Sequence, residues 1–187
     1  MAWKKEGVMK ALVVFESMFG STHELANAIA GGLREVFDVQ VARVDLATPE
    51  QVTSADLLVV GGPTHAHTLS TEASRHSAAT MSADRDGDLH LEEVSMTEGL
   101  REWFDSLAAV PARFAAFDTR SDMARILTGA ASKRIARELR KKGAVAVVPP
   151  ESFLVARYAG LEDGELDRGR EWGKHVALAA SGATTAR

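Results

Sequence analysis

The stretch VVFESMFGSTHELANAIAGGL, from Val13 to Leu33, decides the fold of this chain. It begins in an apolar run that ends at Phe15, and a short polar loop follows from Glu16 to Thr22. Beyond the loop, apolar residues recur at the i, i+4, i+8 spacing of one helical face, at Leu25, Ile29 and Leu33. The stretch therefore predicts a buried strand over 11–15, a loop and an amphipathic helix.

The rest of the chain repeats this alternation of apolar runs and helical patterns. Further strands are expected at 39–44, 57–60, 113–117 and 144–148, and further helices around 100–107, 135–139 and 162–176. Five strands alternating with helices predict an α/β fold with a parallel, three-layered sheet. The run 39–44 and the fifth run, which Pro149 and Pro150 interrupt, are expected at the sheet edges. Gly31 and Gly32 are expected to weaken the first helix near its end.

The length of 187 residues suits one domain, which we place at residues 9–180. Residues 1–8 are expected to be an N-terminal extension outside the fold, and residues 181–187 a frayed tail. Residues 68–97 break the alternation with small and polar side chains. Because long loops within compact domains are often functional, this insertion is either a plain surface excursion or a lid or subunit contact.

Composition excludes several classes of function. The chain has no Cys, which rules out disulfides, thiolate catalysis and Cys-ligated metal centres. Its net charge of −4 makes nucleic acid an unexpected partner. No apolar run reaches the length of a membrane span, and residues 1–10 have no signal-peptide core. A cytoplasmic protein without a membrane span is therefore expected.

The polar loop after the first strand has the features of an anion site. Backbone N–H groups and the positive end of the helix dipole meet there, and Ser17, Ser21 and Thr22 add hydroxyl donors. Gly20 lets the backbone approach a ligand closely, so a phosphate can be bound without Lys or Arg. The loop matches neither Walker A nor G-x-G-x-x-G. The alternative is a plain helix cap by Ser21 or Thr22, assisted by Glu24.

Two more elaborated loops follow the third and fourth strands. GGPTHAHTLS begins at Gly61, and FDTRSDMARILTGAASKR begins at Phe117. In doubly wound sheets, ligands bind outside the carboxyl ends of the strands at the topological switch point. The three loops are therefore expected to converge on one site.

These three segments resemble the flavodoxin family. VVFESMFGSTHELANAIAGGL is similar to the FMN phosphate loop of that family. ADLLVVGGPTHAH resembles its third strand and flavin-side loop, and FAAFDTR its fourth strand and second flavin-side loop. The resemblance extends over about residues 10–180, and it is to flavodoxin-domain proteins of the kind common in actinobacteria. It implies a five-stranded parallel sheet in the order 2-1-3-4-5, for which flavodoxin with FMN at the switch point is itself a standard example.

The resemblance also implies one FMN and the residues that would hold it. The phosphate would be bound by Ser17, Met18, Phe19, Gly20, Ser21 and Thr22. The flavin ring would be flanked by Pro63, Thr64, His65, Ala66 and His67, and by Asp118, Thr119, Arg120 and Ser121. The family usually stacks aromatic side chains on both faces of the flavin ring. Here the loop after the third strand offers His65 and His67, and the loop after the fourth strand has no aromatic residue after Phe117. The missing contacts would weaken FMN binding by roughly 1 kcal/mol or more each.

Several charged residues have more than one interpretation. The first interpretation of His65 and His67 is that they are solvated loop residues. The second is that they bind a metal together with His23, His76 and His90. The third is that, when protonated, they raise the reduction potential of the flavin. We expect no metal, because no ligand spacing is recognised. Arg120 contacts the flavin or forms a surface pair with Asp118 or Asp122. The basic helix face is solvated or docks an acidic redox partner; it comprises Lys133, Arg134, Arg137, Arg140, Lys141 and Lys142.

The sequence thus predicts an FMN-binding, flavodoxin-like electron-transfer protein without a separate catalytic group. Its redox donor and acceptor would be other proteins or NAD(P)H. One alternative is an FMN-dependent NAD(P)H:quinone-type reductase, in which residues 68–97 form a substrate pocket or a subunit contact. The other is a flavin-free binding or scaffold module, because fold does not fix function. Whether the chain is a monomer or a homo-oligomer is left open.

Overall fold

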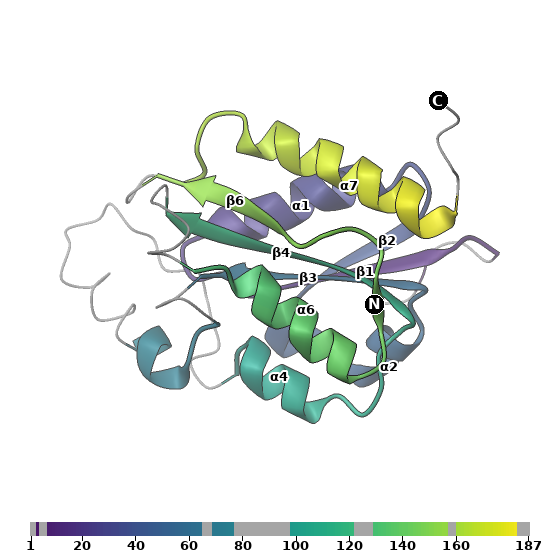
Figure 1. The fold of residues 1–187 in the computed structure, drawn as a ribbon, viewed down its shortest axis with the longest axis horizontal. Coiled ribbons are helices and arrows are strands. Elements are labelled where there is room, and N and C mark those ends of the chain that lie inside the picture. The colour runs from purple at the N-terminus through teal and green to yellow at the C-terminus, as the bar shows by residue number, and fades with distance from the viewer. Residues whose placement is uncertain are drawn as a thin grey trace.

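The computed structural model of this chain is a parallel sheet with helices on both faces (Figure 1). The structure describes residue 3 and residues 7–64, 69–76, 98–121, 129–156 and 160–182. The strands are β1 (Lys10–Phe15), β2 (Asp38–Arg43), β3 (Leu57–Pro63), β4 (Arg113–Ser121), β5 (Val145–Ala146) and β6 (Glu151–Val155). They pair in parallel in the order β2-β1-β3-β4-β5, and β6 also pairs with β4. The predicted order 2-1-3-4-5 is confirmed, with β2 at an edge.

The fifth position of the sheet is shared by two short strands. β5 pairs with the start of β4, at Arg113 and Phe114. β6 pairs with its end, from Phe117 to Ser121. Pro149 and Pro150 lie between the two strands and have no N–H to donate to a ladder, so the predicted single run is interrupted there.

β3 and β4 both continue beyond their predicted ends. The predicted strands stop at 60 and 117, whereas the ladder pairs Gly61 with Phe117 and continues to Pro63 opposite Thr119. A Cβ on Gly61 would lie 2.1 Å from the Phe117 ring, so the glycine makes room for that ring within the sheet. The prediction of a loop at 118–121 is therefore wrong, because these are the last four residues of β4.

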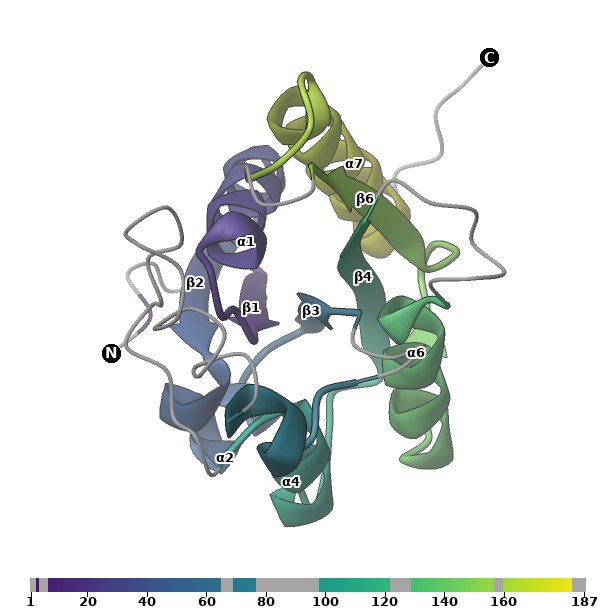
Figure 2. The same cartoon turned by 90° about the vertical axis from the view of Figure 1, so that its left-hand side faces the viewer.

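The helices form two layers. They are α1 (Ser21–Leu33), α2 (Pro49–Thr53), α4 (Leu100–Ser106), α6 (Ala131–Lys141) and α7 (Glu165–Ser181), with a 3₁₀ turn η1 (Val44–Leu46). Residues 72–76 add one short helical segment. α1 and α7 cover one face of the sheet, and α2, α4 and α6 cover the other (Figure 2). Within the described ranges, no helix combines the length and the apolar character needed to cross a membrane.

Two hydrophobic clusters form the core, because successive strand residues point to opposite faces. Leu12, Val14 and Phe114 belong to the cluster beneath α4 and α6. The cluster beneath α1 and α7 contains Ala11, Val13, Phe15, Val59, Ala115 and Phe117. Trp103 is buried, and Trp172 is half-buried against the core. Trp3 packs against the first cluster and donates to Ser54 Oγ at 3.1 Å, so this residue of the expected extension contacts the domain.

α1 and α7 approach each other closely through glycines. A Cβ on Gly32 would lie 2.1 Å from the Arg170 carbonyl oxygen, and one on Gly173 would lie 2.2 Å from the Ile29 carbonyl oxygen. Backbone atoms cannot move aside as a flexible side chain can. Gly32 is therefore a packing position within α1, which the sequence pattern had indicated only as a weak point of the helix.

We expect Gly32→Ala and Gly173→Ala each to lower the free energy of unfolding by about 1–3 kcal/mol, because the added methyl group meets backbone. Gly31→Ala is the matched control. Its nearest neighbour, Arg170 Nε, lies 3.6 Å from the added carbon, and alanine favours a helix by about 0.5–1 kcal/mol over glycine. Urea unfolding of the three variants measures the difference. Equal effects at 31 and 32 would contradict the close approach.

Candidate functional site

A cleft of about 200 Å³ lies at the carboxyl ends of β1, β3 and β4. This is the place where a doubly wound sheet binds ligands. Ten residues predicted to hold a cofactor line it together with Val155; they are Ser17, Met18, Phe19, Ser21, Thr22, Pro63, Thr64, Thr119, Arg120 and Ser121. The three predicted loops therefore converge.

The other predicted site residues lie elsewhere or outside the described ranges. Gly20 shapes the loop, and Asp118 is buried beneath α6. His65, Ala66 and His67 belong to the part of the chain that the structure does not describe. Val155 was missed by the sequence analysis. Val155 is the last residue of β6, which pairs with the end of β4 and so reaches the cleft. The sequence did not predict this position, because nothing in the apolar run indicates a second strand that pairs with β4.

The loop before α1 leaves the start of the helix without a side-chain cap. Gly20 is the N-cap residue with φ +89°, a conformation that favours glycine, and its N–H donates to Ser17 Oγ at 3.1 Å. The first helical hydrogen bond runs from the Glu24 N–H to the Gly20 carbonyl at 2.9 Å. Among the described residues, no acceptor is recorded for the N–H groups of Ser21 and Thr22. The alternative of a plain cap by Ser21 or Thr22 is therefore wrong.

A chain of hydrogen bonds joins the three loops. The Thr22 and Thr119 hydroxyl oxygens lie 2.8 Å apart, and both residues are buried. The Thr119 carbonyl accepts the Thr64 N–H at 2.8 Å. These contacts fix the first turn of α1 relative to the ends of β3 and β4. They also engage the Thr22 hydroxyl in one hydrogen bond within the protein.

The start of α6, by contrast, is satisfied by the protein. The Ala131 N–H donates to Thr64 Oγ1 at 3.0 Å, and the Ser132 N–H donates to Asp118 Oδ2 at 2.7 Å. Burial raises the pKa of the Asp118 carboxyl, although hydrogen bonds from Ser132 act against the rise. Asp118 was predicted to flank a cofactor, but its carboxylate holds α6 instead. The open helix N-terminus at this edge of the sheet is that of α1.

The charge of the cleft is neutral to positive. Within the described part of its lining there is no carboxylate, and Arg120 is the one cation. Arg120 Nη1 donates to the Ser121 carbonyl at 3.2 Å. The positive charge of Arg120 also acts on Asp118, where it opposes the rise of the pKa. A negatively charged ligand therefore meets no repelling carboxylate on these walls.

Three histidines lie within the described ranges: His23 and His76 contact other side chains, and His175 is exposed on α7. The His23 ring stacks on Phe15 with centroids 4.6 Å apart, and His76 Nε2 lies 3.8 Å from Glu72 Oε1. No three potential ligands gather in the described part of the chain. His65, His67 and His90 lie outside it.

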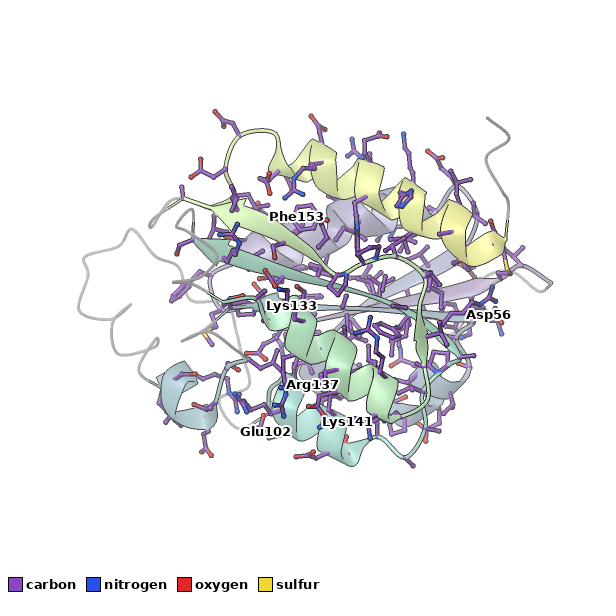
Figure 3. The ribbon with its side chains drawn as sticks, in the orientation of Figure 1. Asp56, Glu102, Lys133, Arg137, Lys141 and Phe153 are labelled. Carbon is purple, nitrogen blue, oxygen red and sulfur yellow. The ribbon has the colours of Figure 1, made fainter. Side chains whose placement is uncertain are left out.

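An acidic residue of α6 itself neutralises part of the positive charge on the basic face of this helix. Glu138 pairs with Arg134 at 2.7 Å and with Lys141 at 3.1 Å. Lys133 and Arg137 are exposed and have no ion pair with any described residue. Figure 3 shows Lys133, Arg137 and Lys141 along α6. The face remains a candidate for an acidic partner.

The sheet topology defines an α/β protein of the doubly wound class, with the open N-terminus of α1 at its switch point. Comparison with known proteins narrows this class. The family model described as Flavodoxin matches residues 13–101. A flavodoxin of Aquifex aeolicus (strain VF5) is 38% identical over 68 residues, which cover 35% of this chain and 37% of that relative.

Solved structures show the same fold over the rest of the chain. A flavodoxin from the domain Archaea gives a TM-score of 0.61 at 20% identity, covering 92% of this chain and 99% of that one. Oxidised flavodoxin 1 from Bacillus cereus gives 0.60 at 21% identity, covering 94% and 99%. The N-terminal half of the chain therefore matches the flavodoxin family model, and the fold is that of flavodoxins of known structure.

We expect the buried Asp118 carboxyl to make stability pH-dependent. Between its ordinary pKa and its raised value, the folded protein keeps a proton that the unfolded chain has lost. The free energy of unfolding therefore falls as pH rises through this window. Asp118→Asn keeps an acceptor for the Ser132 N–H but cannot titrate, so this component should vanish. Urea unfolding from about pH 4 to about pH 7 measures it, and parallel profiles for both proteins would contradict the assignment.

Proposed function

We propose that this chain binds one FMN in the cleft and carries electrons between redox partners. The observation that carries the proposal is the uncapped start of α1, where the N–H groups of Ser21 and Thr22 lack a recorded acceptor among the described residues. Both residues line the cleft. Free amides and the positive end of the helix dipole favour a phosphate at this position.

The residues present fit the phosphate end of FMN. The Ser21 hydroxyl adds a donor at the mouth of the cleft, and Ser17 lies beside it. The absence of carboxylates from the described lining removes the main repulsion for a dianion. This combination explains how a phosphate is bound without a lysine in the loop.

The ring end of FMN would lie between the ends of β3 and β4. The described cleft is smaller than the roughly 300–1,000 Å³ of typical small-molecule sites. Residues 65–67 follow Thr64 directly, and the resemblance assigns them to the ring. Phe19, 36% exposed, is the one aromatic side chain in the described lining. Its ring could replace part of the missing stacking.

FMN, when bound, supplies the redox chemistry by taking up and releasing one or two electrons. The residues of the chain bind it, orient it and set its electrostatic surroundings. Arg120 would stabilise added negative charge in the cleft by simple Coulomb attraction. The hydrogen bonds among Thr22, Thr119 and Thr64 would keep the two walls at a fixed separation.

A carrier is favoured over a turnover enzyme by the composition of the cleft. In the described lining there is no His, Lys, Asp or Glu to move a proton to or from a substrate. The redox partners would be donor and acceptor proteins or NAD(P)H. NAD(P)H oxidation coupled to quinone reduction would identify the reductase alternative, and failure to bind any flavin would favour the scaffold alternative.

We expect the purified protein, mixed with excess FMN and desalted, to retain the visible absorption bands of the flavin. Riboflavin lacks the phosphate, so it should bind more weakly. Ser21→Ala should lower FMN affinity by about 10- to 150-fold, because a hydrogen bond to a charged group is worth about 1.5–3 kcal/mol. The same variant should leave riboflavin affinity unchanged. Equal retention of FMN and riboflavin by the wild-type protein would contradict a phosphate site at α1.

A further inference from the structure

Glu16 is a carboxylate at a position where the strand pattern calls for an apolar side chain. Alternation along β1 places Leu12 and Val14 in the cluster beneath α4 and α6, and Glu16 continues the same face. The residue is 1% exposed, and its N–H donates to the Gly61 carbonyl at 3.0 Å. Burial of an unpaired carboxylate would be costly, so its partners explain its presence.

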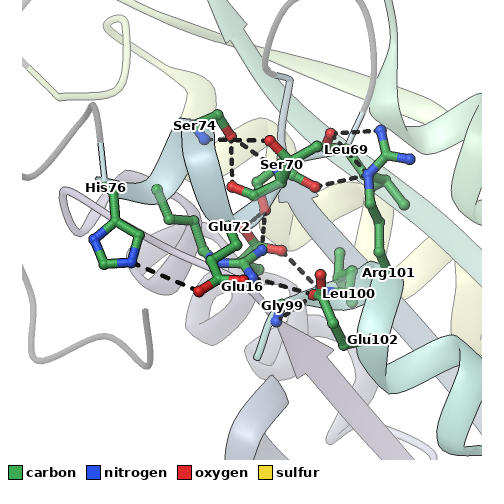
Figure 4. A network of polar contacts seen from close by, with 12 residues as sticks. Glu16, Leu69, Ser70, Glu72, Ser74, His76, Gly99, Leu100, Arg101 and Glu102 are labelled. Atoms are coloured by element: carbon green, nitrogen blue, oxygen red, sulfur yellow. Dashed lines mark hydrogen bonds and ion pairs between the residues drawn. The ribbon is translucent and has the colours of Figure 1, made fainter. Parts of the chain in front are cut away.

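Both carboxylate oxygens of Glu16 have partners from distant parts of the chain (Figure 4). Oε2 accepts the Leu100 N–H at 2.9 Å, at the first residue of α4. Oε1 accepts the hydroxyl of Ser70. Ser70 Oγ in turn accepts a hydrogen bond from Arg75 Nη1 at 3.0 Å. The end of β1 is thereby joined to residues 69–76 and to α4.

A buried arginine completes this network. The Arg75 side chain is 1% exposed, and its Nη2 lies 3.2 Å from Glu102 Oε2. Glu102 also accepts the Gly99 N–H at 2.8 Å. A Cβ on Gly99 would lie 2.3 Å from Arg75 Nη1 and 2.9 Å from Glu16 Oε2, so both charged groups meet over the backbone of Gly99. The start of α4 is therefore held from two sides.

The network adjoins the cleft at Glu16. Glu16 directly precedes Ser17, which lines the cleft beside α1. Ser70 lies six residues after Thr64, which lines the opposite wall and is fixed by hydrogen bonds to Thr119 and Ala131. Thr64 and Ser70 are thus both anchored by hydrogen bonds, and Glu16 provides the anchor at Ser70. Arg101 reinforces it, because its Nε donates to the Ser70 carbonyl at 2.7 Å.

We propose that Glu16 is a positioning residue that fixes the β3 side of the cleft relative to the phosphate loop. Through Ser70 and Arg75, it determines how firmly the ring end of a flavin is held. The inference rests on the proposed function, since it concerns the same cleft. A buried ionic network contributes little net stability compared with apolar side chains of the same size, so its benefit lies in fixing the three segments in place.

The test compares FMN and riboflavin affinities of Glu16→Gln with those of Ser21→Ala. Loss of the Glu16 charge should weaken both ligands by the same factor, about tenfold, because the ring is common to both. The visible absorption bands of the bound flavin should also shift. Ser21→Ala, the matched control on the phosphate side, should weaken FMN alone. Unchanged affinities and spectra in Glu16→Gln, or a loss confined to FMN, would overturn the proposal.

A second variant keeps the proposal testable if Glu16→Gln does not fold. Ser70→Ala removes only the hydroxyl that bridges Glu16 and Arg75, so it should weaken both ligands in the same direction by a smaller factor. If Ser70→Ala folds and its affinities for both ligands match the wild type, the assignment of Ser70 as the anchor is overturned.

Amide hydrogen exchange of the flavin-free protein separates this inference from the proposed function. Glu16→Gln and Ser70→Ala should speed exchange at Leu100 and within residues 69–76, whereas Ser21→Ala should not. If the wild type retains no flavin, the proposed function fails, and this measurement still decides whether Glu16 joins the segments. Exchange that is unchanged in both network variants would overturn the proposal.

Discussion

The hydrogen bond between Thr22 and Thr119 sets the geometry on which the site depends. It joins the first turn of α1 to the end of β4 across the sheet, with the two hydroxyl oxygens 2.8 Å apart. Because β4 lies beyond β3 from β1, this one contact spans the switch point. It keeps the start of α1 at the carboxyl edge, where the Thr119 carbonyl also holds Thr64. The cleft follows from this arrangement.

Two helices begin at this edge, and the protein treats their N-termini differently. The start of α6 receives a hydroxyl from Thr64 and a carboxylate from Asp118. At the start of α1, the N–H of the N-cap residue Gly20 donates to Ser17 Oγ, but the N–H groups of Ser21 and Thr22 have no acceptor among the described residues. A helix N-terminus that is already satisfied cannot attract an anion as strongly as an open one. An anion is therefore expected at α1 and not at α6. The Asp118 carboxyl lies close to the cleft because it accepts the Ser132 N–H at the start of α6.

Much of the fold was predictable because periodicity records it directly. The strand and helix of the opening stretch follow from residue spacing, and the convergence of the three loops follows from the topology of a doubly wound sheet. The order of the sheet follows from the resemblance to flavodoxins. The ends of β3 and β4 were not predictable, since glycines after an apolar run indicate a turn. Only the contact of Gly61 with Phe117 shows that they continue the strand. The division of the fifth run by Pro149 and Pro150 was seen, but the separate pairing of both halves with β4 was not.

The candidate site was predictable where backbone and sequence motif define it. Residues 17–19, 21 and 22 line the cleft because they belong to the loop and first turn that follow the carboxyl end of β1. Two roles could not be read from the sequence. Asp118 faces α6 because β4 continues past Phe117, and Glu16 bonds to residues 54 and 84 positions away. A single acidic residue after a strand carries no periodic signal of such partners.

The central claim is that the open start of α1, and not the start of α6, binds the phosphate of FMN. The most direct measurement is a titration of the ¹⁵N-labelled protein with FMN, followed by the amide resonances in two-dimensional NMR. The account predicts the largest shifts at Ser21 and Thr22, with the amides of Ala131 and Ser132 little changed, and a similar but weaker pattern with inorganic phosphate. Shifts concentrated at Ala131 and Ser132, or no shift at Ser21 and Thr22, would contradict it.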